Sequence, residues 1–230
     1  KEYFKNMRTL EYEWNDDLSD ASINLAFNKK LANERKDWLY AYDKNDILDD
    51  VLQRTNRIEY SQFVHKELIH FSNYNVERSI PSICDGFKRS LRKIMYCCLK
   101  RKLHKEIKVA QLAGYVSEHG AYHHGEASLH EAIIGMAQDF VGSNNINLLL
   151  PNGQFGTRIQ GGKDSASPRY IHTQLNPVVT QLFPSDDFDT LDYMDEDGMK
   201  IEPVHYVPII PMILVNGSVG IGTGFSTNIP

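Results

Sequence analysis

The sequence predicts an α+β fold whose central part is a winged helix-turn-helix. Two observations lead to this prediction. Between residues 90 and 140, three segments space their apolar side chains as short amphipathic helices do. Two short apolar runs separated by Pro-Asn-Gly follow, which is typical of a β-hairpin. Three helices followed by a hairpin form the outline of a winged helix, and 41% hydrophobic with 24% charged residues is the composition of a folded chain.

The chain before this region predicts helices joined by a polar segment. Residues 1–60 are polar, and residues 21–38 are rich in side chains that favour helices. Residues 43–50 are acidic and predict a loop or linker. Residues 61–79 look helical, and Arg78-Ser79-Ile80-Pro81 marks a break after them.

The three central helices are each defined by one apolar face. The first starts near Ser90 and carries basic side chains on its remaining surface. The second covers residues 109–118, and a turn follows at residues 120–125. The third is marked by a capping box, Ser128 to Glu131, in front of an apolar stripe.

The segments after the third helix predict strands. Residues 146–150 and 154–159 are the two arms of the predicted hairpin. Residues 186–202 are acidic, and the sequence leaves open whether they are ordered. Residues 207–215 are apolar and predict buried strands, and residues 217–224 are rich in glycine.

The net charge of the chain conceals two opposite segments. The 25 basic and 30 acidic residues give a formal net charge of −5, which by itself argues against a nucleic-acid binder. Residues 81–108, however, hold nine basic and two acidic residues, a net charge of +7, whereas residues 186–202 have a net charge of −7. A basic helix leading into a helix-turn-helix is typical of a protein that binds phosphate backbones, and a solvated helix face is the alternative.

The cysteines and the apolar segments indicate the cellular compartment of the protein and whether it spans a membrane. Two of the three cysteines are adjacent, so they predict no disulfide framework and favour a reducing compartment. The longest apolar stretch, residues 206–215, contains two prolines and is too short to cross a membrane. Since the chain has no signal peptide and starts at Lys1 rather than Met, we expect it to be a fragment.

The most polar segment of the chain, residues 161–170, is a candidate phosphate site. Its glycines, hydroxyls, Lys163 and Arg169 could hold a phosphate. Tyr170 ends the segment, and a phenol with an ordinary pKa of about 10 is a weak nucleophile until its anion is stabilised. Arg169 would stabilise that anion and bind phosphate as well. A tyrosine after Pro-Arg is more often structural, so the interpretation depends on the predicted winged helix.

Several longer motifs stand in one order between residues 76 and 230. They are residues 79–88, 108–114, 122–126, 140–145, 153–158, 161–170, 208–217 and 220–224. Together they resemble the type IIA family of eukaryotic DNA topoisomerase II. The resemblance implies the end of a metal-binding Toprim domain at residues 1–45, a linker at 46–56, a CAP-like winged-helix cleavage domain at 57–185, and the start of an α/β tower (shoulder) domain at 186–230.

The resemblance also implies roles for single residues. Tyr170 matches the nucleophile that attacks a DNA phosphodiester and forms a 5′-phosphotyrosyl link, and Arg169 matches the neighbour that stabilises the scissile phosphate. His124 matches a histidine that contacts the same phosphate, although His123 is an alternative. Ile221 matches an isoleucine that wedges between base pairs and bends the DNA. Further DNA contacts are expected at Lys93, Arg92, Lys108, His123, Gln138, Arg158 and Lys163.

The implied activity is DNA cleavage and religation within an ATP-dependent type II topoisomerase, an isomerase. We expect a homodimer that acts on double-stranded DNA in the nucleus, with no membrane association. The Mg²⁺ ligands and the ATP-binding residues are expected outside this chain, so the chain alone should be inactive. A non-catalytic winged-helix DNA-binding module is the main alternative, and a protein-interaction domain is favoured only by the acidic total charge.

Overall fold

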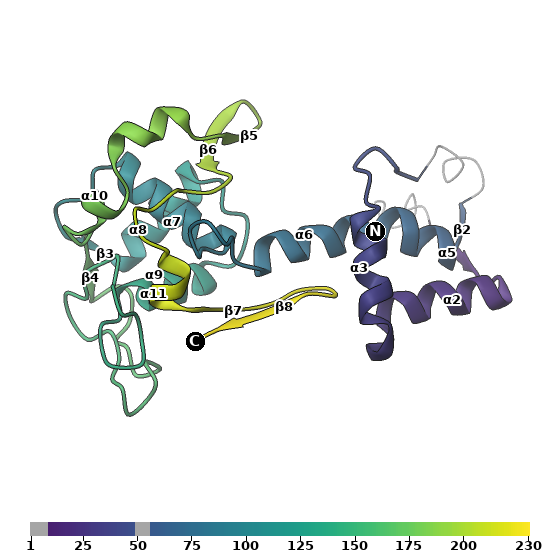
Figure 1. Ribbon diagram of the computed structural model, residues 1–230, viewed down its shortest axis with the longest axis horizontal. Coiled ribbons are helices and arrows are strands. Elements are labelled where there is room, and N and C mark those ends of the chain that lie inside the picture. Colours follow the sequence, from purple (N-terminus) through teal and green to yellow (C-terminus); the bar gives the residue numbers. More distant parts are fainter. Residues whose placement is uncertain (1–8, 49–55) are drawn as a thin grey trace, which may run out of the picture. The chain divides into compact units, whose positions relative to one another are not determined.

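The computed structural model describes residues 9–48 and 56–230, which form two compact units (Figure 1). The first unit contains the residues up to Ile80 together with residues 221–226. The second contains residues 81–220 and 227–230. Most of the predicted linker at 46–56 lies outside the described residues. The unit boundary follows Ile80, so the helical segment predicted at 61–79 belongs to the first unit.

The first unit is a small helical body with one two-stranded parallel sheet. Its elements are β1 (Glu11–Glu13), α2 (Asp16–Phe27), η1 (Lys29–Leu31), α3 (Ala32–Tyr40), β2 (Arg57–Glu59), α5 (Tyr60–Phe63), the π-helical turn η2 (Val64–Leu68) and α6 (Ile69–Ser79). Ala26, Trp38, Leu39, Val64 and Ile69 form its core. The helices predicted at 21–38 and 61–79 are therefore confirmed.

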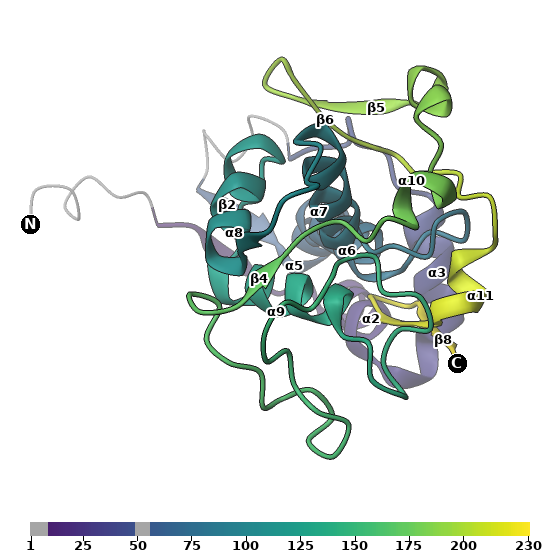
Figure 2. The ribbon, with the colours of Figure 1, turned by 90° about the vertical axis from the view of Figure 1, so that its left-hand side faces the viewer.

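The second unit is built on three helices that enclose its core (Figure 2). These are α7 (Arg89–Lys100), α8 (Val109–His119) and α9 (Glu126–Ala137), which confirm the three predicted central helices. Ile94, Met95, Leu112, Leu129 and Ile133 are fully buried between them. Burying apolar side chains of this size stabilises the unit by about 1.5–3 kcal/mol each.

The remaining elements of the second unit are short. They are β3 (Ile107–Lys108), β4 (His172–Thr173), α10 (Val179–Leu182), η3 (Ser185–Thr190), β5 (Tyr193–Glu196), β6 (Met199–Pro203) and α11 (Met212–Asn216). β7 (Ser218–Ile221) and β8 (Ser226–Ile229) form a hairpin whose tip, residues 221–226, is grouped with the first unit. Within the described residues, no helix is long and apolar enough to span a membrane.

The predicted hairpin of residues 146–150 and 154–159 is wrong. Leu149 instead bridges Leu175, and Asn152 bridges His172, both antiparallel. β4 also pairs with β3, where Lys108 lies opposite His172. The strands therefore find partners far away in the sequence, which a local turn signal cannot reveal. Residues 153–166 form an irregular loop that projects from the helices (Figures 1 and 2).

Two further expectations fail for local reasons. α9 begins after Gly125, so Ser128 lies inside its first turn and is not the N-cap. The apolar residues 207–215 form an irregular segment and α11 rather than buried strands. Pro208 and Pro211 lack the N–H that a strand ladder requires, and Ile209 and Leu214 remain exposed.

The acidic residues 186–202 are ordered as η3 and the β5–β6 hairpin. Asp197 and Gly198 form the hairpin turn with positive φ angles of 52° and 78°. A two-residue turn with positive φ at both positions matches the twist of the two strands. The Asp-Gly pair therefore gives this acidic segment a defined fold, and two of its carboxylates face the rest of the unit, as described below.

We predict that native protein exposes one cysteine to thiol reagents. Cys97 and Cys98 are buried in α7, and burial raises the pKa of the Cys97 thiol to about 12 and that of Cys98 further. Cys84 is exposed. At pH 8, a colorimetric thiol reagent should label one cysteine rapidly in native protein, none in Cys84→Ser, and all three after denaturation. Rapid labelling of a second cysteine in native protein would contradict the placement of α7 in the core.

Candidate functional site

The segment that carries Tyr170 is fixed at the start of α8. The N–H of Ala110 donates to the carbonyl oxygen of Pro168 at 3.1 Å, and the N–H of Val109 donates to that of Ile171 at 3.0 Å. The first amides of a helix have no partner within the helix, so α8 takes its partners from both sides of the tyrosine. Tyr170 itself is 78% exposed. The result is a rigid backbone that presents a phenol to solvent.

Two cationic residues flank this tyrosine. Arg169 precedes it and is exposed. Lys108 is the N-cap residue of α8, is also exposed, and its Cα pairs with that of His172 in the β3–β4 ladder. The fold therefore brings Lys108, which lies far earlier in the sequence, to the same end of α8 as the Arg169–Tyr170 pair. An anion at this point would meet positive charge from two separate elements.

Arg158 and Lys163 lie on the irregular loop of residues 153–166, which is closed by its own side chains. Both oxygens of the Asp164 carboxylate accept from Thr157, one from its N–H and one from its hydroxyl, each at 2.8 Å. The hydrogen bond from the Thr157 N–H lowers the pKa of the Asp164 carboxyl. The loop is thus held closed at neutral pH while it presents Arg158 and Lys163 to solvent.

The side chain of Gln138 holds this loop through two of its backbone carbonyl groups. Its side-chain N–H₂ donates to the carbonyl oxygens of Phe155 at 2.8 Å and of Gly162 at 3.2 Å. Gly162 has a φ of +79°, and a Cβ there would lie 2.3 Å from the Gln138 amide nitrogen. The positive φ favours glycine at this position, and a Cβ would also push the Gln138 amide away from its hydrogen-bond partners. Gln138 therefore has a structural role in this loop, and its expected contact with DNA stays a prediction.

His123 and His124 are both exposed on the turn between α8 and α9. His123 Nε2 lies 2.6 Å from Glu196 Oε1 of β5. The ring of His124 packs edge-on against Tyr122, with 5.4 Å between the ring centroids. The structure thus gives the two neighbouring histidines different surroundings.

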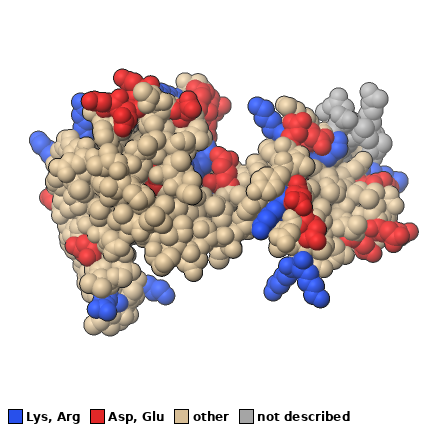
Figure 3. Space-filling view, viewed as in Figure 1, with Lys and Arg blue, Asp and Glu red and all other residues tan. Residues whose placement is uncertain are grey.

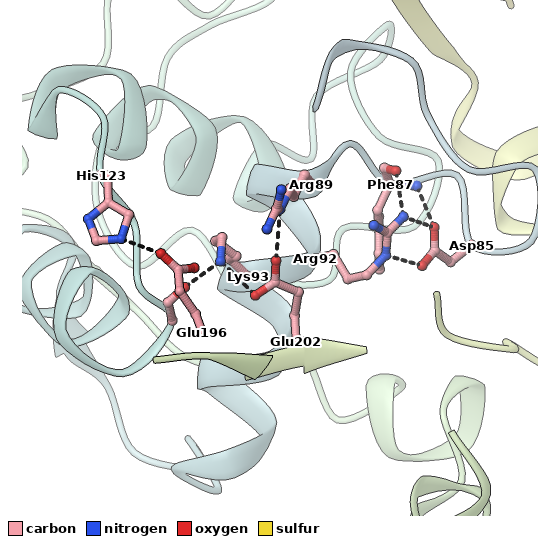
Figure 4. Close-up of polar contacts among 9 residues, drawn as sticks. Asp85, Phe87, Arg89, Arg92, Lys93, His123, Glu196 and Glu202 are labelled. Carbon is pink, nitrogen blue, oxygen red and sulfur yellow. Dashed lines mark hydrogen bonds and ion pairs between the residues drawn. The ribbon is translucent and has the colours of Figure 1, made fainter. Parts of the chain in front are cut away.

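Arg92 and Lys93 are buried, which does not agree with their expected role as DNA contacts (Figure 4). Arg92 binds Asp85 through two nitrogens at 2.7 and 3.0 Å. Lys93 lies 2.7 Å from Glu202 and 2.5 Å from the carbonyl oxygen of Gly120. Each residue is only 6% exposed, and a buried cation needs such a partner. These two cations therefore hold the unit together rather than contacting phosphate.

The remaining charges of the second unit are separated on its surface. Figure 3 shows acidic side chains gathered over η3 and the β5–β6 hairpin and basic side chains at the tip of the 153–166 loop. The exposed basic residues of the +7 segment that follow α7 are Arg101, Lys102, Lys105 and Lys108. The cationic surface thus comes from Lys100 at the end of α7, the turn after it and the loops, while Arg92 and Lys93 of α7 lie in the interior.

Sequence reasoning missed the carboxylates that neutralise α7. Asp85 and Glu202 are both fully buried. One signal was present: residues 94–98 of α7 are apolar without interruption, so this part of the helix has no polar face and belongs in the interior. Cations at its start, Arg92 and Lys93, then require buried acidic partners.

Residues 78–230 match the family model for the A-type subunit of DNA gyrase/topoisomerase IV. The chain belongs to this family. Residues 1–76 match the C-terminal associated domain of TOPRIM. The resemblance to eukaryotic DNA topoisomerase II is confirmed by relatives that match over the whole chain.

Two curated relatives and one solved structure illustrate this similarity. DNA topoisomerase 2 of Arabidopsis thaliana is 58% identical over 232 residues, and human DNA topoisomerase 2-alpha is 50% identical over 241 residues. The chain is covered completely in both and spans 16% of each relative. A Plasmodium falciparum topoisomerase II DNA-binding, cleavage and re-ligation domain is 50% identical, with a TM-score of 0.81, over 100% of this chain and 31% of that one. The chain therefore has the topoisomerase II cleavage-domain fold of mixed helices and strands.

We predict that Gly162→Ala destabilises the second unit more than Gly161→Ala does. Both glycines have positive φ, so both alanines carry the backbone strain of about 1 kcal/mol. A Cβ at Gly161 meets nothing within 4 Å, whereas one at Gly162 meets Gln138. Because the Gln138 amide can move aside only by giving up its hydrogen bonds to Phe155 and Gly162, the extra loss of unfolding free energy in urea should be about 1 kcal/mol.

The double variant Gly162→Ala/Gln138→Ala separates the clash from the strain. Gln138→Ala removes the amide that the new Cβ would meet. In the Gln138→Ala background, Gly162→Ala should therefore lower the unfolding free energy by no more than Gly161→Ala does in the unchanged chain. An equal loss of unfolding free energy for Gly161→Ala and Gly162→Ala in the otherwise unchanged chain would show that Gln138 does not hold the loop.

Proposed function

We propose that this chain is the DNA cleavage and religation part of an ATP-dependent type II DNA topoisomerase. The observation that carries the proposal is an exposed tyrosine, Tyr170, on a backbone fixed at the start of α8 beside Arg169. The names of the relatives, DNA topoisomerase 2, support it, as does the likeness to a solved DNA-binding, cleavage and re-ligation domain. Because the chain spans only a small part of those relatives, the activity of the whole enzyme is part of the proposal.

The proposed chemistry is a reversible phosphoryl transfer. The Tyr170 hydroxyl gives up its proton to solvent and its oxygen attacks a backbone phosphorus. The bond from that phosphorus to the 3′ oxygen breaks, and the 3′ oxygen takes up a proton from solvent. The product is a 5′-phosphotyrosyl ester, and attack by the 3′ hydroxyl reverses the step without an external energy source. Phosphoryl transfer depends mainly on positioning and on neutralising charge. Arg169, Lys108 and His124 would supply that charge around the phosphate.

The domain assignment is also a proposal. The resemblance implies a CAP-like winged helix over residues 57–185. We assign residues 81–185 to it, because residues 57–80 belong to the first unit. In this assignment α7, α8 and α9 are the helices, and residues 149–152 with β4 take the place of wing strands. Residues 186–230 would start the tower domain. The match of residues 1–76 to a TOPRIM-associated domain supports placing the end of a Toprim region before the winged helix.

The proposal places Mg²⁺ and ATP outside this chain. Among the residues that the structure describes, no group of three or more His, Cys, Asp or Glu side chains is arranged to hold a metal ion. A double-strand break needs one tyrosine for each strand, so we propose that the protein acts as a homodimer. We propose further that it works in the nucleus and passes one DNA duplex through another. This would relieve supercoils and catenanes.

Ile221 is proposed as the residue that bends DNA by wedging between base pairs. It is 77% exposed at the end of β7. The turn that follows is fixed on α6, because the Thr223 N–H and hydroxyl both donate to the Asn75 side-chain oxygen at 3.0 and 3.2 Å. An apolar side chain on a fixed hairpin can unstack a base step.

We predict that Tyr170→Phe abolishes covalent capture of DNA. The chain would be tested within an enzyme that also contains the Toprim and ATPase regions, incubated with supercoiled DNA and Mg²⁺ and then denatured with detergent. Tyr40→Phe is the matched control, since Tyr40 is 77% exposed but lies in the first unit. Only Tyr170→Phe should leave no adduct above background.

Two outcomes would contradict the proposal. Adducts in Tyr170→Phe would show that another residue is the nucleophile. DNA binding that weakens steeply with salt, without any adduct in the unchanged enzyme, would favour the non-catalytic DNA-binding module instead.

A further inference from the structure

We propose that the β5–β6 hairpin is a positioning element for the histidine turn, residues 120–125, and that Lys93, Glu202 and Glu196 are its positioning residues. The inference rests on the proposed function, in which His124 contacts the scissile phosphate. Glu202 on β6 holds the start of this turn through Lys93, and Glu196 on β5 holds His123 directly (Figure 4). A single hairpin thus fixes the turn at two points.

The first point is the carbonyl oxygen of Gly120, at the end of α8. The Lys93 ammonium lies 2.5 Å from this oxygen and 2.7 Å from Glu202 Oε2. Carbonyl groups at the end of a helix have no partner within the helix, and a cation is a favourable partner there. Glu202 is fully buried and also accepts from Arg89 Nε at 3.3 Å, so its position is set by two cations.

The backbone at this point has little room to move. A Cβ on Gly120 would lie 3.1 Å from Cys97 Sγ of α7. The next residue, Ala121, is 8% exposed and has a φ of +49°, a conformation that non-glycine residues adopt only when their surroundings require it. Together with the Lys93 contact, this packing fixes where the turn leaves α8.

The second point is His123, two residues further along. Its Nε2 lies 2.6 Å from Glu196 Oε1, although 73% of the His123 side chain is exposed. A contact at the surface is not needed to exclude water from the core. Its effect is to fix the backbone of His123 next to His124, which points to a role in orienting the turn rather than in stabilising the fold.

The test compares the removal of two charges from the same hairpin. Glu196→Gln weakens the contact with His123, whereas Asp197→Asn removes an equal charge from the exposed hairpin turn. Both positions are away from the core, so both variants should melt at the same temperature as the unchanged enzyme. Lys93→Met would leave Glu202 buried without its cation and can fail to fold, so it is not the deciding variant.

The readout is the single-turnover rate at which the full enzyme becomes covalently linked to DNA. Glu196→Gln should lower this rate by about tenfold, because displacing a group by about 1 Å can lose up to about a hundredfold. Asp197→Asn should leave the rate unchanged. If Glu196 acts through the histidine turn, Glu196→Gln should have no further effect in a His124→Ala background.

Two results would overturn the inference. One is an equal rate for Glu196→Gln and Asp197→Asn. The other is an equal fall in this rate when Glu196→Gln is made in the unchanged enzyme and in the His124→Ala variant. A group that acts through His124 cannot keep its effect once the His124 side chain has been removed. Neither result depends on the identity of the nucleophile, which Tyr170→Phe tests separately, so this inference can fail while the proposed function stands.

Discussion

The ion pair between Arg92 and Asp85 is the interaction on which the second unit depends. The buried Asp85 carboxylate accepts from Arg92 and also from the N–H groups of Phe87 and Tyr206, both at 2.9 Å. It therefore joins the loop before α7, α7 itself and the chain leading to α11. A buried ion pair is tolerated only when such further hydrogen bonds satisfy it. Because α7 is fixed in this way, α8 and α9 have a defined surface to pack on.

The same principle changes the meaning of the charge distribution. The +7 of residues 81–108 includes two buried cations, Arg92 and Lys93. The −7 of residues 186–202 includes Glu202, which pairs with Lys93, and Glu196, which contacts His123. The cations that remain available to bind a phosphate near Tyr170 are exposed ones, such as Arg169 and Lys108. Net charge therefore says little about a site until each charge is assigned to the interior or to solvent.

The sequence was sufficient to predict the helices, which depend on residues close together in the chain. It was not sufficient to predict strand pairing and buried ion pairs, which depend on residues far apart in the chain. The spacing of apolar residues was sufficient to find α7, α8 and α9. The hairpin after α9 was wrong, because Leu149 finds its partner at Leu175 rather than across the Pro-Asn-Gly turn. Lys93 was expected to contact DNA, and local patterns could not reveal its partner Glu202, which lies 109 positions later in the sequence. The roles of Tyr170 and Arg169 came from a resemblance and stay predictions.

The most direct test of the central role of this ion pair is the unfolding free energy of Arg92→Met, measured in urea by circular dichroism, together with the salt dependence of DNA affinity. The buried pair predicts a loss of about 3–5 kcal/mol, because Asp85 is left without its cation, and an unchanged salt slope. Lys105→Met, at an exposed lysine, should change stability by less than about 0.5 kcal/mol. Unchanged stability in Arg92→Met, with a salt slope reduced by about one, would mean that Arg92 binds phosphate and does not hold the unit together.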